Sequence, residues 1–230
     1  MFVGIPPRKK PRFLWATPLL FASLWLAYVV AALRAPAGRI ATTLDWGVLT
    51  GGLDSGSAWR DAIVDGSILR LFSGLFLHAD WIHLLGNLIF LLIFGLPAER
   101  SMGGWRFLLL FLLGGAASNL AAVLAIGTPD RVVIGASGAV SALIGAYLAL
   151  FPGARLGVVL PLGLFLQFVR VPAFLLIGLW ALLQVLFAHS GPALGAVAWP
   201  AHIGGFVFGI AFALGTRAAI ARRLRHSRGY

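Results

Sequence analysis

The chain has 230 residues, of which 60% are hydrophobic and 11% are charged, and its formal net charge is +11. Because a soluble domain is about 25% charged, this composition indicates a polytopic membrane protein. The chain contains no cysteine, which excludes disulfides, thiol catalysis and cysteine-based metal sites, and we expect no metal and no cofactor.

Basic residues gather near the two ends of the chain, next to long apolar runs. This pattern is typical of membrane orientation signals and of contacts with anionic headgroups, so we expect a lipid bilayer and no nucleic acid as partner. We predict basic cytoplasmic tails at residues 1–12 and 218–230, on either side of a membrane domain at 13–217. The basic residues near the ends are Arg8, Lys9, Lys10, Arg12, Arg217, Arg222, Arg223, Arg225 and Arg228.

The first apolar run extends from Phe13 to Leu33. It could be a signal peptide, with a weak cleavage site at Ala35-Pro36-Ala37. Because the run is longer than the roughly 7–15 residues of a signal-peptide core, we interpret it as a retained transmembrane helix.

Residues 34–80 differ from the rest of the chain, because they contain five of its seven acidic residues. Short apolar clusters, together with Trp46 and Trp59, favour amphipathic pieces in the membrane interface, where indole rings prefer to lie. The segment is too long for a passive connection, and we predict a structured outer loop.

The remaining apolar runs give a count of six spans and an all-α membrane protein. The second run is closed by Pro97 and Glu99-Arg100, and the fourth is stopped by Pro152-Gly153. We treat 156–168 as re-entrant or interfacial, because it is short and interrupted by proline and glycine. The other predicted spans are 81–96, 107–126, 136–151, 171–188 and 201–214.

Charge supports this count. With a cytoplasmic N-terminus, six spans leave both basic tails inside and place every acidic residue except Glu99 in the outer loops. Seven spans would put the C-terminal arginines outside, against the positive-inside bias. We therefore expect an integral protein of a cell membrane, inner or plasma, with both termini in the cytoplasm.

Four polar groups begin the spans that run from outside to inside. His83 and Asn87 lie in the first turns of the second span, Ser137 begins the fourth and His202 begins the sixth. They therefore share one depth near the outer surface, and the spacing of four puts His83 and Asn87 on one helix face.

Small residues follow helical spacing on the fourth and sixth spans. Such faces let two backbones approach closely in lipid, as a hydrogen bond of about 2.6–3.2 Å between Ser137 and His202 would require. The residues that we assign to this packing are Gly138, Ser141, Gly145, Gly205 and Gly209.

A serine and a histidine at one depth indicate acyl transfer. His202 would act as general base for Ser137 and then protonate the leaving amine, with His83, Asn87 and the Ser137 amide as candidate oxyanion donors. Because no acidic residue lies within a predicted span, we predict a dyad, with the active site opening to the outer face.

Each group also has a structural interpretation. Gly-x-Ser-Gly is common in membrane helices for packing, His202 could bond a carbonyl, and Asn87 could join helices. His78, like the other histidines outside the spans, would be solvated or structural, and Trp199 would be an interfacial anchor. Ionisable groups in lipid are functional by default, however, and the combination at one depth favours chemistry.

In this order the motifs resemble the rhomboid family of intramembrane serine proteases, from about residue 60 to 217. The resemblance implies a six-helix bundle with a short central fourth helix, a Ser137–His202 dyad in a water-filled cavity, and transmembrane protein substrates with weak helicity near the cut. The matching motifs are His83-x-x-x-Asn87, Glu99-x-x-x-Gly103, Gly135-Ala-Ser137-Gly138 and Ala201-His202-x-x-Gly205-x-x-x-Gly209.

The chain departs from the family pattern in two places. Ser141 stands where many members have an aromatic residue that stacks on the histidine, and Leu69-Arg70 aligns with a Trp-Arg pair, although Trp59-Arg60 lies upstream. Two other functions stay open: a catalytically inactive rhomboid-like protein that binds membrane clients, and a small transporter or channel. The inactive protein would lack the serine or histidine, and a transporter would favour inverted repeats or an intramembrane carboxylate.

Overall fold

The computed structural model describes residues 13–51, 53, 55–127, 131–162, 165–189 and 198–228. The expected basic tail at 1–12, most of the loop between 190 and 200, and the acidic residues Asp54 and Asp130 lie outside the described residues.

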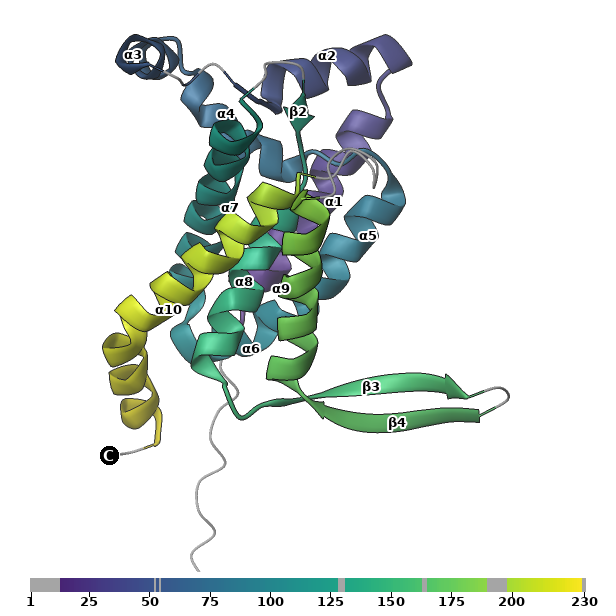
Figure 1. Ribbon diagram of the computed structural model, residues 1–230, viewed down its shortest axis with the longest axis vertical. Coiled ribbons are helices and arrows are strands. Elements are labelled where there is room, and N and C mark those ends of the chain that lie inside the picture. Colours follow the sequence, from purple (N-terminus) through teal and green to yellow (C-terminus); the bar gives the residue numbers. More distant parts are fainter. Residues whose placement is uncertain are drawn as a thin grey trace, which may run out of the picture.

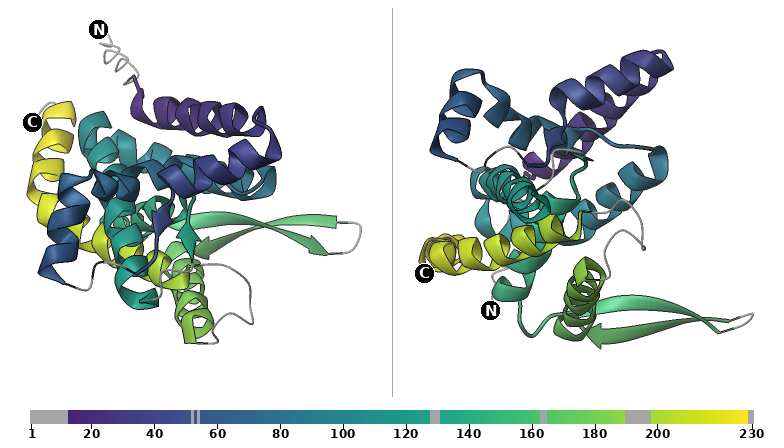
Figure 2. Two further views of the ribbon diagram at one scale, coloured as in Figure 1. Left: turned by 90° about the horizontal axis from the view of Figure 1, so that it is seen from above. Right: turned by 45° about the horizontal axis from the view of Figure 1, so that its top comes forward.

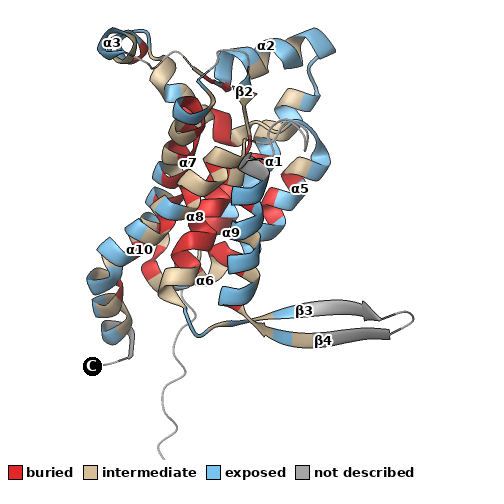
Figure 3. Cartoon of the chain, in the orientation of Figure 1, coloured by how far each residue is buried: buried red, intermediate tan, exposed pale blue. Residues whose placement is uncertain are grey.

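The chain is mostly helical, and a short helix occupies the centre of the bundle (Figure 1). This helix, α8 (Ser137–Leu150), is buried from Gly138 to Tyr147, and the other helices surround it (Figure 3). Three described helical stretches are long and apolar enough to cross a membrane: Trp81–Met102, Gly104–Ile126 and Trp199–Arg225. The surrounding helices are α1 (Ala16–Ala32), α5 (Trp81–Phe90), α7 (Gly104–Ile126), α9 (Ala173–His189) and α10 (Trp199–Arg228).

The second span is longer than the sequence indicates. We expected it to close at Pro97, but a wide π-helical turn, η3 (Leu91–Gly95), leads into a further helix, α6 (Leu96–Met102). The wide turn and the position of Pro97 in the first turn of α6 accommodate a residue that has no N–H to donate. Gly103, at a φ of +85°, ends the helix.

Glu99 therefore lies within this span and is almost fully buried. Its carboxylate accepts backbone N–H groups from Trp15, Ala16 and Thr17 at 2.8–2.9 Å. These donors begin α1, where the first N–H groups have no carbonyl partner within the helix and the dipole favours negative charge. The expectation that no acid lies within a span is wrong, because the helix continues past Glu99 to Met102. The buried carboxylate is tolerated there because it bonds the start of α1.

The packing of α8 against α10 depends on glycine. A Cβ atom on Gly145 would overlap the carbonyl oxygen of Phe206, and one on Gly205 would overlap that of Gly138. Gly209 lies in the same way against the carbonyl of Ala142. The two backbones are thus in direct contact, as the small-residue faces predict.

The segment 34–80, predicted as a structured loop, forms helices at one end of the bundle (Figure 1). Its strand β1 (Val48–Leu49) pairs antiparallel with β2 (Val132–Val133), which lies just before α8. The loop is therefore tied to the approach to the central helix. Its helical elements are α2 (Pro36–Trp46), α3 (Gly56–Val64), η1 (Ser67–Leu69), α4 (Arg70–Ser73) and η2 (Gly74–Phe76).

Two expectations about the C-terminal third are wrong. The segment 156–168 belongs to an antiparallel hairpin of β3 (Arg155–Leu162) and β4 (Phe165–Pro172), which extends away from the helices (Figure 2), so the chain is not all-α. A short apolar run does not distinguish strand from helix by periodicity, and the β-branched valines of this run favour the strand. The helix expected to end at Leu214 continues to Arg228, because its basic end contains no helix breaker except Gly215.

Replacing Glu99 with glutamine should destabilise the fold. An amide turns one of the two acceptor oxygens into a donor that faces N–H groups, so we expect a loss of about 2–3 kcal/mol. Denaturant unfolding in detergent micelles measures the change. Asp61→Asn, at an exposed acid of α3, is the control and should have no measurable effect. Equal stability of both variants would contradict the role of Glu99.

Two glycines of α10 should respond oppositely to alanine. Gly209→Ala places a methyl group against the backbone of α8 and should lower stability by about 1–3 kcal/mol. Gly215→Ala meets open space and should leave stability unchanged or raise it, because alanine favours helix. Thermal unfolding of both variants in one detergent compares them, and a stable Gly209→Ala protein would refute direct backbone contact.

Candidate active site

Ser137 is presented by a tight turn at the start of α8. Gly135, at a φ of +113°, donates its N–H to the carbonyl of Gly74 at 2.9 Å, and a Cβ atom there would strike the ring of His83. Only glycine combines this conformation with this contact. Because Ser137 is the first residue of α8, its own N–H has no carbonyl acceptor within the helix.

His202 approaches Ser137 from the first turn of α10. Its Nε2 atom lies 2.8 Å from the Ser137 hydroxyl oxygen, within hydrogen-bond distance. The two residues are 65 positions apart, and the contact between α8 and α10 brings them together. The geometry is that of a hydroxyl next to a base.

Two residues that we did not single out as site residues also contact His202. The Gln184 side-chain oxygen, from α9, lies 2.7 Å from His202 Nδ1. The Trp199 ring stands edge-on to the imidazole, with centroids 5.8 Å apart. The signal for Gln184 was present, because it is the only amide or charged side chain in the run 173–188. Trp199 was expected to be an interfacial anchor, although it precedes His202 by three positions in α10, a spacing that puts two side chains on one helix face.

Ser141 does not take the place of the stacking aromatic. Its hydroxyl donates to the carbonyl of Ser137 at 2.7 Å, within α8, and the side chain is almost fully buried. It is therefore occupied by the helix itself, and His202 is held from α9 and α10.

Two cavities meet at the serine–histidine pair. One, of about 240 Å³, lies between α5, α8, α9 and α10 and is lined by Asn87, Trp180 and Gln184 among others. The second, of about 640 Å³, extends toward β2 and is lined by Arg131 and Trp199 among others. Ser137, His202 and His83 line both. Within the described ranges, no three His, Cys, Asp or Glu side chains gather as a metal site would require.

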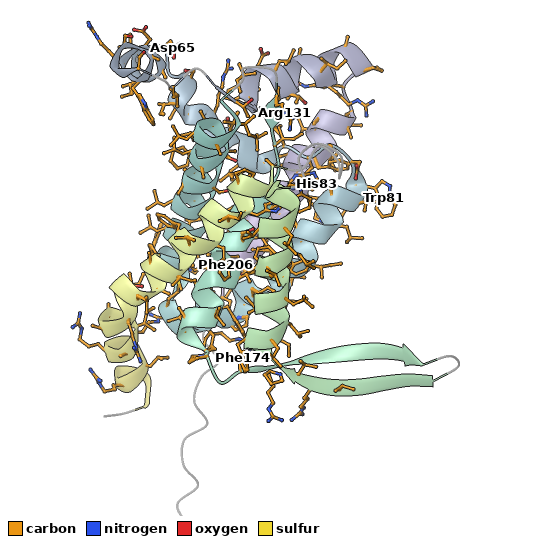
Figure 4. All side chains as sticks on the ribbon, in the orientation of Figure 1. Asp65, Trp81, His83, Arg131, Phe174 and Phe206 are labelled. Carbon is orange, nitrogen blue, oxygen red and sulfur yellow. The ribbon has the colours of Figure 1, made fainter. Side chains whose placement is uncertain are left out.

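His83 and Asn87 lie on the α5 side of these cavities. The His83 backbone N–H donates to the Asp80 side chain, which caps α5, and Figure 4 shows His83 at the β2 end of that helix. The Asn87 Nδ2 group is buried and has no hydrogen-bond partner among the described residues. A buried, unpaired donor that lines the same cavity as Ser137 is available to an oxyanion.

His78 supports the turn before Ser137 from outside the spans. Its Nε2 atom accepts the N–H of Ala136 at 3.5 Å, and its ring stands edge-on to His83, with centroids 5.1 Å apart. Burial, and then the charge on His83, lower the pKa of His78 to about 4. At neutral pH the ring is therefore uncharged and keeps a lone pair for Ala136.

A sequence profile of the Rhomboid domain matches residues 65–219. The chain is 34% identical over 94 residues to "RHOMBOID-like protein 5" of Arabidopsis thaliana, covering 41% of this chain and 30% of that protein. It is 36% identical over 98 residues to "Putative rhomboid protease YdcA" of Bacillus subtilis (strain 168), covering 39% and 48%. For "Rhomboid-related protein 2" of Mus musculus the identity is 35% over 105 residues, covering 46% and 32%. The chain therefore matches less than half the length of each relative.

The lowered pKa of His78 makes stability depend on pH. The unfolded histidine, with a pKa near 6.5, binds protons that the folded one, with a pKa of about 4, excludes. The contribution of neutral His78 to the free energy of unfolding is therefore fully present above about pH 6.5 and is lost as the pH falls to about 4. In His78→Gln, which keeps an acceptor and does not titrate, the melting temperature in detergent should fall less over this range. An identical pH profile for both proteins would contradict the assignment.

Proposed function

Because this chain belongs to the rhomboid family, we propose that it is an intramembrane serine endopeptidase that cleaves transmembrane segments of other proteins. Ser137 is the nucleophile and His202 the general base. The observation that carries the proposal is the distance of 2.8 Å between the Ser137 hydroxyl oxygen and His202 Nε2.

The first half of the reaction acylates Ser137. The hydroxyl oxygen attacks the scissile carbonyl carbon while its proton passes to His202 Nε2. When the tetrahedral intermediate collapses, the carbon–nitrogen bond breaks and the same proton goes to the leaving amine. The free amine and a Ser137 ester are the products of this half.

The oxyanion of the intermediate needs donors on the side opposite the base. The Ser137 N–H at the start of α8, the unpaired Asn87 Nδ2 and the His83 ring are the candidates. A preorganised donor of this kind contributes about 2.7–4 kcal/mol to the transition state. The helix dipole of α8 adds to the same effect.

The second half needs water beside the ester. His202 removes a proton from that water, the hydroxide attacks the ester carbonyl, and the proton then returns to the Ser137 oxygen as the acid leaves. The larger cavity, with Arg131 and Asp80 among its polar lining, supports the entry of water to the pair.

The membrane arrangement that we propose keeps the expectations from the sequence. Six spans cross a cell membrane, both termini are cytoplasmic, and the pair opens toward the outer face. The domain consists of residues 13–217, with basic tails at 1–12 and 218–230. Among the described residues, three long apolar helices and the shorter apolar helices α1, α8 and α9 support a multi-pass protein.

The alternative is a catalytically inactive rhomboid-like protein that binds membrane clients. It would have no use for a hydroxyl and an imidazole held at hydrogen-bond distance, which is why we favour the protease. A transporter would need charged groups along its path, and among the described residues the buried carboxylate, Glu99, is already bonded to α1.

Substitution of either residue of the pair should abolish cleavage. The protein is reconstituted in liposomes with a reporter that carries a transmembrane segment, and Ser137→Ala and His202→Ala are compared with the parent. We expect kcat to fall about 10⁴-fold or more in each. A fluorophosphonate reagent should label the parent and not Ser137→Ala.

Ser23→Ala provides the matched control, because its hydroxyl lies on the exposed side of α1 and bonds only within that helix. It should cleave and be labelled like the parent. Undiminished cleavage by Ser137→Ala would refute the nucleophile assignment, and binding of the reporter without cleavage by the parent would favour the inactive alternative.

A further inference from the structure

We propose that Gln184 is a positioning residue that completes a Ser137–His202–Gln184 triad, by fixing which nitrogen of His202 carries the proton. This inference rests on the proposed function and extends it. It replaces the dyad expected from the sequence with three hydrogen-bonded side chains from α8, α10 and α9.

The contact has the features of a built interaction. Gln184 Oε1 lies 2.7 Å from His202 Nδ1, and the Gln184 side chain is only 7% exposed. It comes from a helix whose neighbouring positions Leu182 and Leu183 are exposed and apolar. A lone amide on an apolar helix would be costly to bury without a partner, and the partner it has is the histidine.

The chemistry of an amide oxygen decides the protonation of the ring. A carbonyl oxygen only accepts, so the hydrogen bond requires the proton of neutral His202 to be on Nδ1. Nε2, 2.8 Å from the Ser137 oxygen, then presents its lone pair to the hydroxyl. This is the tautomer that a general base needs, and the opposite tautomer would offer Ser137 a donor.

Gln184 thus fixes the tautomer and orientation of the histidine, as the aspartate does in a serine–histidine–aspartate triad, but without a charge. An asparagine amide has the same place in the Cys-His-Asn arrangement of papain-like proteases. An uncharged acceptor suits an apolar helix, because a carboxylate there would need a compensating charge. The other groups facing the pair are Trp199, whose ring edge meets the imidazole, and His83 across the cavity.

Gln184→Met replaces the amide oxygen with a thioether sulfur that accepts only weakly and keeps the length of the side chain, whereas Gln184→Glu keeps an acceptor oxygen in either protonation state. In the reporter assay, kcat of Gln184→Met should fall about tenfold or more, with KM within about twofold. Gln184→Glu should restore kcat to within about threefold of the parent. Leu183→Met, on the exposed side of the same helix, is the matched control and should cleave like the parent.

A spectroscopic measurement separates positioning from a general loss of structure. ¹⁵N NMR of histidine-labelled protein, with the His202 signals identified by their absence in His202→Ala, reports which ring nitrogen is protonated. The parent should show a proton on Nδ1, and Gln184→Met should show an increased share of the Nε2-protonated form. An Nε2-protonated parent, or an unchanged tautomer in Gln184→Met, would overturn the proposal.

The two claims fail separately. If cleavage requires Ser137 but Gln184→Met retains the parent kcat, the protease assignment stands and the positioning role of Gln184 is wrong. If the parent does not cleave, the proposed function fails, and the NMR tautomer still decides whether Gln184 sets the protonation of His202.

Discussion

The contact between the backbones of α8 and α10 is the constraint on which the site depends. Gly145, Gly205 and Gly209 each face a carbonyl oxygen of the other helix, with no room for a Cβ atom. A serine hydroxyl and an imidazole are short, so they meet at 2.8 Å only if their helices nearly touch. In lipid, where apolar burial does not drive association between helices, such packing is also a main source of helix–helix affinity.

Hydrogen bonds at the edges of the bundle hold this core in place. At one end of the bundle, the β1–β2 pair, the Gly135–Gly74 bond and the His78–Ala136 bond tie the turn before Ser137 to residues 34–80. Elsewhere Glu99 ties the start of α1 to α6. The segment 34–80 is therefore part of the support of the site, which nothing in its composition indicated.

The surroundings of His202 explain how an imidazole is oriented where the family pattern is broken. Ser141 bonds to its own helix, and the ring is instead held by Gln184 and bordered by Trp199. In the described part of the chain, the one buried carboxylate is Glu99, and its oxygens are already occupied by the start of α1. An amide is thus the third group available to the pair.

The sequence by itself determined the membrane class, most of the helices, the family and the pairing of Ser137 with His202, because hydropathy, charge bias and helical spacing are local properties that survive without coordinates. The catalytic roles stay predictions. Only the structure showed the π-helical passage through Pro97 and the hairpin at 155–172, because the local sequence is ambiguous there. Only the tertiary structure decided the partners of Glu99, because they come from a segment distant in the sequence. The same holds for Gln184: the sequence shows a lone amide in an apolar helix, and only the fold shows that it faces His202 Nδ1, since nothing in the sequence of α9 records which helix lies alongside it.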